Sequence, residues 1–368
     1  MSDTGLEAVD ALYEQLMVDD GWAVRHERGF SWWSYRLAQH IEAGPALQSG
    51  DLDVYIVRIW TDEAHDVGPE GNPAAMLGHL NQMAQMSTLV WDENSGIIFE
   101  CCTAVVHREN IGWLSKVLAT AAVLQNTAAH SRAHGIAKTC GGVPSASAHP
   151  TSGQRSEMDD ILNVPEQVIA AMGAEPSRYT GVLSEGLGAT AASMGWVANS
   201  DATGVVYEIP FTGNRPLFLQ DAGSPDTVLE TALVQIFTDQ PHPEAGNGAL
   251  LVMRLPVSPD PGDAVFLANG LNLAESSGDW RAPLLGAWCP DPMSDDGRGL
   301  AFSCFLPNLL ARPGLLENQV VYQGGRVRFA LEELARLRGL SIDQIADEQT
   351  QQSARVQEMR SRKSTSDE

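Results

Sequence analysis

The chain has 368 residues, and its 47 acidic and 23 basic side chains give a formal net charge of −24. At about 150 residues per domain, this length predicts two domains. A hydrophobic content of 43% is typical of a protein that buries a core. The acidity argues against binding to nucleic acids and against docking on anionic lipid, because both need a surplus of Lys and Arg.

Both halves of the chain share this acidity. Residues 1–126 carry 18 acidic and 6 basic side chains, and residues 166–340 carry 20 and 10. The charge is therefore not an acidic tail on a neutral protein. Self-repulsion that keeps the protein in solution is the simplest interpretation. The alternative is that the charge keeps a binding protein with an exposed apolar surface soluble, or attracts basic partners.

Targeting features are absent from the sequence pattern. The N-terminal stretch MSDTGLEAVD is acidic and has no apolar segment, which predicts no signal peptide. No apolar run approaches 18 residues, so we expect no membrane insertion. The five cysteines are odd in number and lack CxxC spacing, which favours reduced thiols and a cytoplasmic location.

In chain order, the first half alternates helical and strand patterns. Apolar residues between Leu6 and Met17 recur at helical spacing, with Thr4 as the predicted cap. The stretch LDVYIVRIW (52–60) is apolar on both faces except at Arg58, which indicates a central strand. The other expected elements are a strand at 30–38, a loop up to 51, a helix at 76–84, a hairpin of 87–91 and 97–106, and a helix over 110–121. The predicted order is α-β-β-β-α-β-β-α, an antiparallel sheet packed with helices.

The second half repeats this order. LLVMRLPV (250–257) aligns with VYIVRIWT (54–61), which places Arg254 on Arg58. Further matches place Leu271-Asn272 on Leu80-Asn81, Trp288 on Trp91, and Phe302 and Cys304 on Phe99 and Cys101. Because the matches keep their order, the sequence predicts a duplication, and hence an α+β fold of two tandem related domains.

The domain boundaries follow from composition. We place the first repeat at 1–127 and the second at 161–340. Residues 128–160 are rich in Gly, Ser, Pro and Ala and have no apolar period, which predicts a flexible linker. Residues 341–368 are polar and predict a helical to disordered tail. Two copies in one chain predict a monomer with an internal pseudo-dimer.

Motifs for catalysis or cofactor binding do not stand out. His130 and His134 have HxxxH spacing but lack a general-base Glu between them, so a solvated linker is the preferred interpretation. There is no GxSxG nucleophile elbow and no phosphate-binding loop. An acidic cluster without EF-hand spacing is interpreted as a solvated loop; it comprises Asp62, Glu63, His65, Asp66 and Glu70. We expect no catalytic residue, metal or cofactor.

Aromatic and arginine side chains are the candidates for a binding surface. Trp32 and Trp33 are adjacent in a predicted strand, so they point to opposite faces and one of them needs cover from elsewhere. Arg58 and Arg254 lie in apolar strands, where each could form an ion pair or anchor a partner's carboxylate. The full set of candidates is Trp32, Trp33, Tyr35, Arg58, Trp60 and Arg254.

The element order resembles a known fold. The stretches GWAVRHERGFSWWSYRLAQ, LDVYIVRIWTDE, TLVWDENSGIIFECCTAVVH and NIGWLSKVLATAAVLQ carry the likeness, with GVVYEIPF, LLVMRLPV and GLAFSCFLPN as their partners in the second half. They resemble the type III secretion chaperone fold and YbjN-like domains. The duplicated form is similar to actinobacterial chaperone-like proteins, including export chaperones for accessory Sec-dependent secretion. The resemblance implies a fused pair in place of a homodimer, with an apolar groove for an unfolded client segment.

The sequence therefore predicts a cytoplasmic, non-enzymatic protein that holds a client protein for secretion. One alternative is an adaptor or regulator that binds a single folded partner. Another is an enzyme, such as a hydrolase that uses His107 or His65 with nearby acidic residues.

Overall fold

The computed structural model describes residues 3–170, 175–200, 204–211, 230–257, 259–278, 283–294, 298–341 and 344–345. The elements of the first half are α1 (Thr4–Gln15), β1 (Ala23–His26), β2 (Gly29–Trp33), β3 (Ala38–Ala43), β4 (Leu47–Ser49), β5 (Leu52–His65), α2 (Pro73–Asn81), β6 (Thr88–Asp92), β7 (Ile97–Val106) and α3 (Ile111–Cys140). These strands form an antiparallel sheet in the order β1-β2-β3-β5-β7-β6, with β4 and β8 (Val143–Pro144) also paired to β5.

The second half forms a sheet with the corresponding strand order. Its elements are α4 (Val182–Met194), β9 (Val197–Ser200), β10 (Gly204–Phe211), β11 (Glu230–His242), β12 (Gly246–Arg254), α5 (Pro261–Ser276), β13 (Ala287–Pro290), β14 (Leu300–Pro307) and α6 (Leu315–Arg338). The order β9-β10-β11-β12-β14-β13 follows that of the first sheet strand by strand. The α+β class with antiparallel sheets is confirmed.

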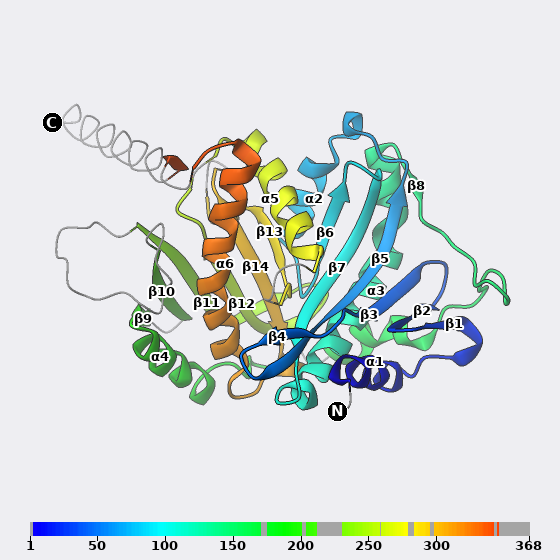
Figure 1. The fold of residues 1–368 in the computed structure, drawn as a ribbon, viewed down its shortest axis with the longest axis horizontal. Coiled ribbons are helices and arrows are strands. Elements are labelled where there is room, and N and C mark those ends of the chain that lie inside the picture. The colour runs from blue at the N-terminus through cyan, green and yellow to red at the C-terminus, as the bar shows by residue number, and fades with distance from the viewer. Residues whose placement is uncertain are drawn as a thin grey trace.

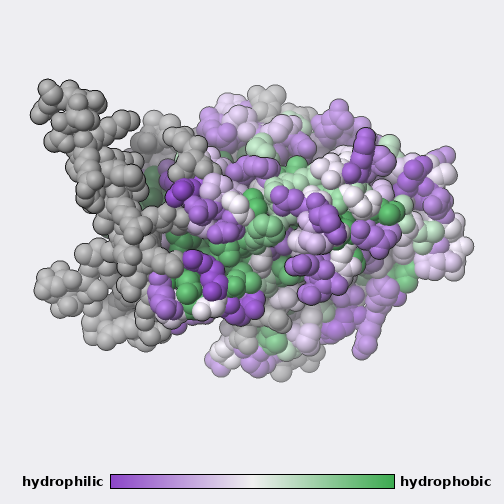
Figure 2. All heavy atoms as spheres, turned by 90° about the horizontal axis from the view of Figure 1, so that it is seen from above, coloured by the Kyte–Doolittle hydropathy of each residue, from purple (hydrophilic) through white to green (hydrophobic). Residues whose placement is uncertain are grey.

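Helices pack on opposite sides of the two sheets. Figure 1 shows α6 in front of the second sheet and α3 behind the first, with α2 and α5 between them. Seen from above, hydrophilic side chains dominate the surface and hydrophobic residues gather toward the middle of the view (Figure 2). No helix within the described ranges is long and apolar enough to cross a membrane.

In the described residues, each half has four main strands before its middle helix, one more than the predicted order contains. The expected single strand at 30–38 ends at Trp33, and the chain turns before β3 begins at Ala38. Strand β1 is half exposed, so it lacks the apolar alternation that would mark it. The predicted cap of the first helix is also wrong: Asp3, not Thr4, accepts the hydrogen bond from the Leu6 amide at 3.1 Å.

The two middle helices, α2 and α5, form the same hydrogen bonds with the edge strands of their sheets, β6 and β13. Asn81 of α2 donates Nδ2 to the Leu89 carbonyl and accepts from the Leu89 amide, both at 2.9 Å. Asn272 of α5 makes the same pair of bonds to Trp288, at 2.9 and 2.8 Å. The predicted match of Asn272 with Asn81 therefore corresponds to an identical contact in the structure.

Strand pairing shows that other predicted matches are out of register. With Asn272 on Asn81, Trp288 occupies the place of Leu89 rather than Trp91. Leu89 pairs with Glu100 and Trp288 with Phe302, so Phe302 takes the place of Glu100. Cys304 likewise takes the place of Cys102, and Arg254 that of Asp62 instead of Arg58. Strand β14 is buried on both faces, so hydrophobicity alone cannot fix its register.

The halves also exchange contacts directly. Thr103 of β7 pairs with Leu284, which precedes β13, through two backbone hydrogen bonds of 3.2 and 2.9 Å. Reciprocally, the Phe305 amide of β14 donates to the carbonyl of Gln85, which precedes β6, at 2.9 Å. One hydrophobic cluster contains buried residues of both halves, from Leu12 in α1 to Leu331 in α6. The two sheets thus share a core.

The prediction of a flexible linker at 128–160 is wrong. Residues 128–140 are the last three turns of α3, and β8 follows almost at once. The remaining segment crosses the ends of β2 and β3, where the Ser147 amide donates to the Arg36 carbonyl and the Asp159 amide to the Ser34 carbonyl. Backbone hydrogen bonds hold this segment, which explains why it has no apolar period. Most of the predicted tail (341–368) lies outside the described residues.

Candidate binding face

Trp32 and Trp33 point to opposite faces of the first sheet, as predicted, and the chain itself covers both. Trp32 is buried under the helices and donates Nε1 to Gln39 at 2.9 Å. On the other face, Trp33 donates Nε1 to the Ser147 hydroxyl at 2.9 Å and lies edge-on to the His149 ring at 5.1 Å. Neither indole is open to a ligand.

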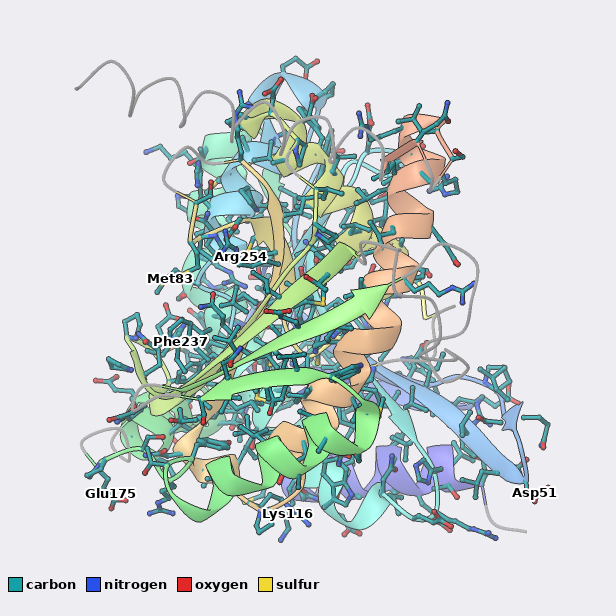
Figure 3. All side chains as sticks on the ribbon, turned by 90° about the vertical axis from the view of Figure 1, so that its left-hand side faces the viewer. Asp51, Met83, Lys116, Glu175, Phe237 and Arg254 are labelled. Atoms are coloured by element: carbon teal, nitrogen blue, oxygen red, sulfur yellow. The ribbon has the colours of Figure 1, made fainter. Side chains whose placement is uncertain are left out.

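Tyr35 and Arg254 lie apart from the rest of the predicted set. Tyr35 is half-buried between the His130 ring, at 6.1 Å, and the Arg36 guanidinium. Arg254 is at the end of β12 (Figure 3), and its Nε lies 2.6 Å from Oδ2 of the buried Asp291. Arg254 therefore forms the satisfied ion pair that was one of its two predicted interpretations.

Arg58 and Trp60 are the two predicted residues that the structure brings together. They are two positions apart on β5, on the face of the first sheet opposite α3, and both are half-buried. The Arg58 guanidinium lies 4.7 Å from the centre of the Trp60 ring and 5.4 Å from that of Phe99 on β7. We name the surface formed by Arg58, Trp60, Phe99 and His40 the Arg58 face.

Among the described residues, the charge of Arg58 has no carboxylate partner. In the described part of the chain, no carboxylate oxygen lies within 4.0 Å of its guanidinium, and its Nε is buried without a hydrogen-bond partner. Burial raises the pKa of the neighbouring Asp62, and the charge of Arg58 opposes this shift. Burial also raises the pKa of the Cys101 thiol, which Arg58 likewise opposes. Arg58 is thus a half-buried cation that contacts two aromatic rings.

A histidine that the sequence pattern does not mark, His40, completes this face. His40 stacks on Trp60 at 4.9 Å, and its Nδ1 lies 2.7 Å from the Ser31 hydroxyl. Ser31 in turn lies 2.8 Å from Nε2 of His26. Burial lowers the pKa of His40. A nucleophile–base arrangement also needs a group that orients the base, and within the described residues no carboxylate bonds to either imidazole. The sequence pattern predicts a loop at His40, whereas His40 lies in β3. The alternation of side chains along this strand therefore does not enter the prediction of the face.

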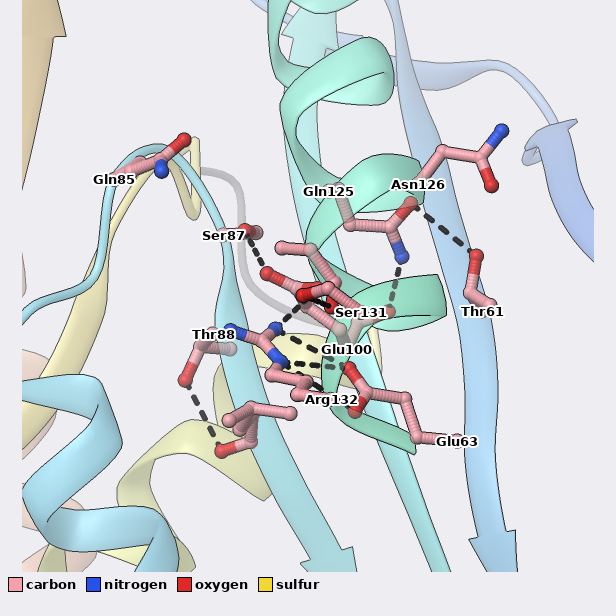
Figure 4. A network of polar contacts seen from close by, with 12 residues as sticks. Thr61, Glu63, Gln85, Ser87, Thr88, Glu100, Gln125, Asn126, Ser131 and Arg132 are labelled. Carbon is pink, nitrogen blue, oxygen red and sulfur yellow. Dashed lines mark hydrogen bonds and ion pairs between the residues drawn. The ribbon is translucent and has the colours of Figure 1, made fainter. Parts of the chain in front are cut away.

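A second polar cluster, the Arg132 network, lies on the other face of the first sheet (Figure 4). Arg132 of α3 donates Nε and Nη2 to Glu63 at 3.2 Å and also pairs with Glu100. Glu63 is fully buried, and this burial, together with the charge of Glu100 and against that of Arg132, raises its pKa to about 8. The interpretation of Glu63 as part of a solvated loop is wrong, because Glu63 lies in β5 and is buried against Arg132.

The other predicted clusters do not form sites in the described structure. His130 accepts from the Leu37 amide through Nε2, at 3.2 Å, and lies 2.9 Å from the Asn126 carbonyl through Nδ1. Both ring nitrogens are therefore occupied. His65 contacts Asp66 at 2.9 Å. Across the described ranges, no group of three or more His, Cys, Asp or Glu side chains is arranged to hold a metal ion. All five cysteines are buried and free.

Comparison with known proteins adds no relative: no family model matches the chain, and no curated protein or solved structure matches it either.

Proposed function

We propose that this protein is a non-enzymatic chaperone that holds client proteins for secretion, and that a client segment binds to the Arg58 face. The observation that carries this proposal is the Arg58 guanidinium, which is partly desolvated on Trp60 and Phe99 and has no carboxylate partner among the described residues. The resemblance of the element order to the secretion chaperone fold supports the same function.

The chemistry of the face favours a client segment that combines apolar and acidic residues. Stacking on aromatic rings leaves the edge of a guanidinium group available, and a planar carboxylate can accept two of its N–H groups. A buried donor that gains such a partner recovers part of its desolvation cost. The half-buried ring of Trp60 offers apolar area beside this anchor. The net charge of −24 keeps a complex with exposed apolar segments in solution.

We also propose that the two halves are tandem copies of one unit, as in a fused dimer. The matching strand order and the identical contacts of Asn81 and Asn272 support this relationship. The Arg58 face itself is not repeated, because Leu250 occupies the position of Arg58 in the second sheet. The proposed client site therefore occurs once per chain.

The proposal is tested by aggregation assays with several chemically unfolded exported proteins. Light scattering should fall as the purified protein is added in stoichiometric amounts. The absence of an effect on every client would rule out a chaperone. A single folded partner recovered at fixed stoichiometry, with no effect on unfolded clients, would instead identify an adaptor.

A further inference from the structure

A small cavity opens beside the Arg132 network, where the two halves of the molecule meet. Its polar lining comes from the segment before β6, from β7, from α3 and from the turn between β11 and β12 of the second half, and comprises Asn81, Gln85, Ser87, Glu100, Arg132 and Glu244. Leu80, Met83, Ala84, Leu89 and Ala128 complete the wall. The cavity has room for a group about the size of a water molecule.

Gln85 presents an unsatisfied acceptor at this cavity. Its side chain is more than nine-tenths buried, and its Nε2 donates to Glu244 at 2.9 Å, while Oε1 has no hydrogen-bond partner. Because an ionised carboxylate can only accept, this contact fixes the orientation of the amide. A buried amide oxygen without a donor costs free energy, so an occupant that donates a hydrogen bond would be stabilised here.

The charges around the cavity leave an excess of negative charge. Arg132 is the only cation in its lining, and it is already paired with Glu63 and Glu100. Glu100 also accepts from the Ser87 hydroxyl. Glu63 holds its proton at neutral pH because its pKa is about 8. Glu100 and Glu244 then outweigh Arg132 by one charge.

We propose that this cavity binds a primary ammonium group at the end of an aliphatic chain. An ammonium has three N–H donors and no acceptor, which matches the oxygens of Gln85, Glu100 and Glu244. A divalent metal is disfavoured because Ca²⁺ takes six to eight oxygen ligands and Arg132 occupies part of the site. The ammonium could belong to a small diamine or to a lysine side chain of a partner.

Calorimetric titration at pH 7 with n-butylammonium tests the site. Saturable binding is expected, whereas tetramethylammonium, which has the same charge and no N–H donor, should not bind. Gln85→Leu and Glu244→Gln should each weaken butylammonium binding at least tenfold. The backbone bond from Gln85 to Phe305 persists in the first variant, and Glu244 lies at the surface, so the second tests the site even if the first folds poorly.

Glu93→Gln is the matched control, because Glu93 lies on an exposed turn and its replacement removes the same charge. It should leave the affinity unchanged. Equal binding of the two cations, or unaltered affinity in both cavity variants, would overturn the proposal and assign the cavity to water. Pentane-1,5-diamine and Nα-acetyl-lysine amide, which keeps its side-chain ammonium, then separate the two sources. Stronger binding of pentane-1,5-diamine indicates a free diamine, and stronger binding of Nα-acetyl-lysine amide indicates the lysine of a partner.

Discussion

Glu63 shows how the fold changes a side chain that looks like an exposed acid. It is fully buried, and its pKa of about 8 lies above the ordinary value of 4.5. Between these values the folded protein holds a proton that the unfolded chain releases. Its contribution to stability is therefore complete below pH 4.5 and is lost as the pH rises through 8.

The variant Glu63→Gln stays neutral and should remove this dependence. Denaturant unfolding from pH 5 to 8 should show that the wild type loses stability relative to Glu63→Gln as the pH rises, by at most about 1.4 kcal/mol per pH unit. Glu70→Gln, at an exposed position, should run parallel to the wild type. A pH-independent difference between the wild type and Glu63→Gln would contradict the assignment.

Arg326 and Glu275 form an ion pair that water does not reach. Both side chains are fully buried and their atoms lie 3.2 Å apart, and Glu275 also accepts from the Trp288 indole at 2.7 Å. Glu275→Leu leaves a buried cation, so the free energy of unfolding should fall by about 3–5 kcal/mol. The exposed pair Arg328–Glu332 provides the control, since Glu332→Leu should cost about 1 kcal/mol or less. Similar losses in both variants, measured by urea denaturation, would be inconsistent with this role.

At the residue scale, only part of the Arg58 face could be predicted from the sequence. Arg58 and Trp60 are two positions apart in a clear strand, so their common face could be predicted. Phe99 and His40 reach the same face from other strands, and their contacts depend on pairing over long sequence distances. The partners of Arg254 and Trp33, Asp291 and Ser147, are likewise distant in sequence.

At the scale of elements, the two asparagines are the clearest similarity between the two halves. Each satisfies one amide and one carbonyl on the inner edge of its sheet, and both side chains are buried. The sequence revealed this match through a shared Leu-Asn pair, Leu80-Asn81 in one helix and Leu271-Asn272 in the other. The strand matches failed because fully buried strands have no polar side to fix their register.

Asn81→Ala and Asn272→Ala should destabilise the protein to a similar extent. Each leaves a buried donor and a buried acceptor unpaired, which costs about 2–4 kcal/mol. Thermal and urea unfolding measure the loss. Asn94→Ala, in an exposed turn, is the control and should change stability by less than about 0.5 kcal/mol. A loss below about 1 kcal/mol in either helix variant would show that the edge bonds are not needed.

At the scale of the whole molecule, the halves are more closely joined than tandem domains on a flexible linker. Leu284 pairs with the first sheet and Gln85 with the second, and the hydrophobic core is shared. We therefore expect one cooperative unfolding transition, with calorimetric and van't Hoff enthalpies in agreement. Two separate transitions would indicate independent domains. The close joining of the two halves could not be predicted from the sequence. Leu284 and Gln85 reach the opposite sheet through backbone hydrogen bonds, which leave no pattern of side chains in the sequence.

Whether the Arg58 face binds an acidic, apolar client segment is tested by measuring the affinity of a fluorescent unfolded peptide of that composition. Arg312 is the matched control, since it is exposed and lies 5.4 Å from the Trp113 ring, away from this face. Arg58→Gln should weaken binding at least tenfold, while Arg312→Gln should bind like the wild type. Equal affinities for the wild type and both variants would contradict the account.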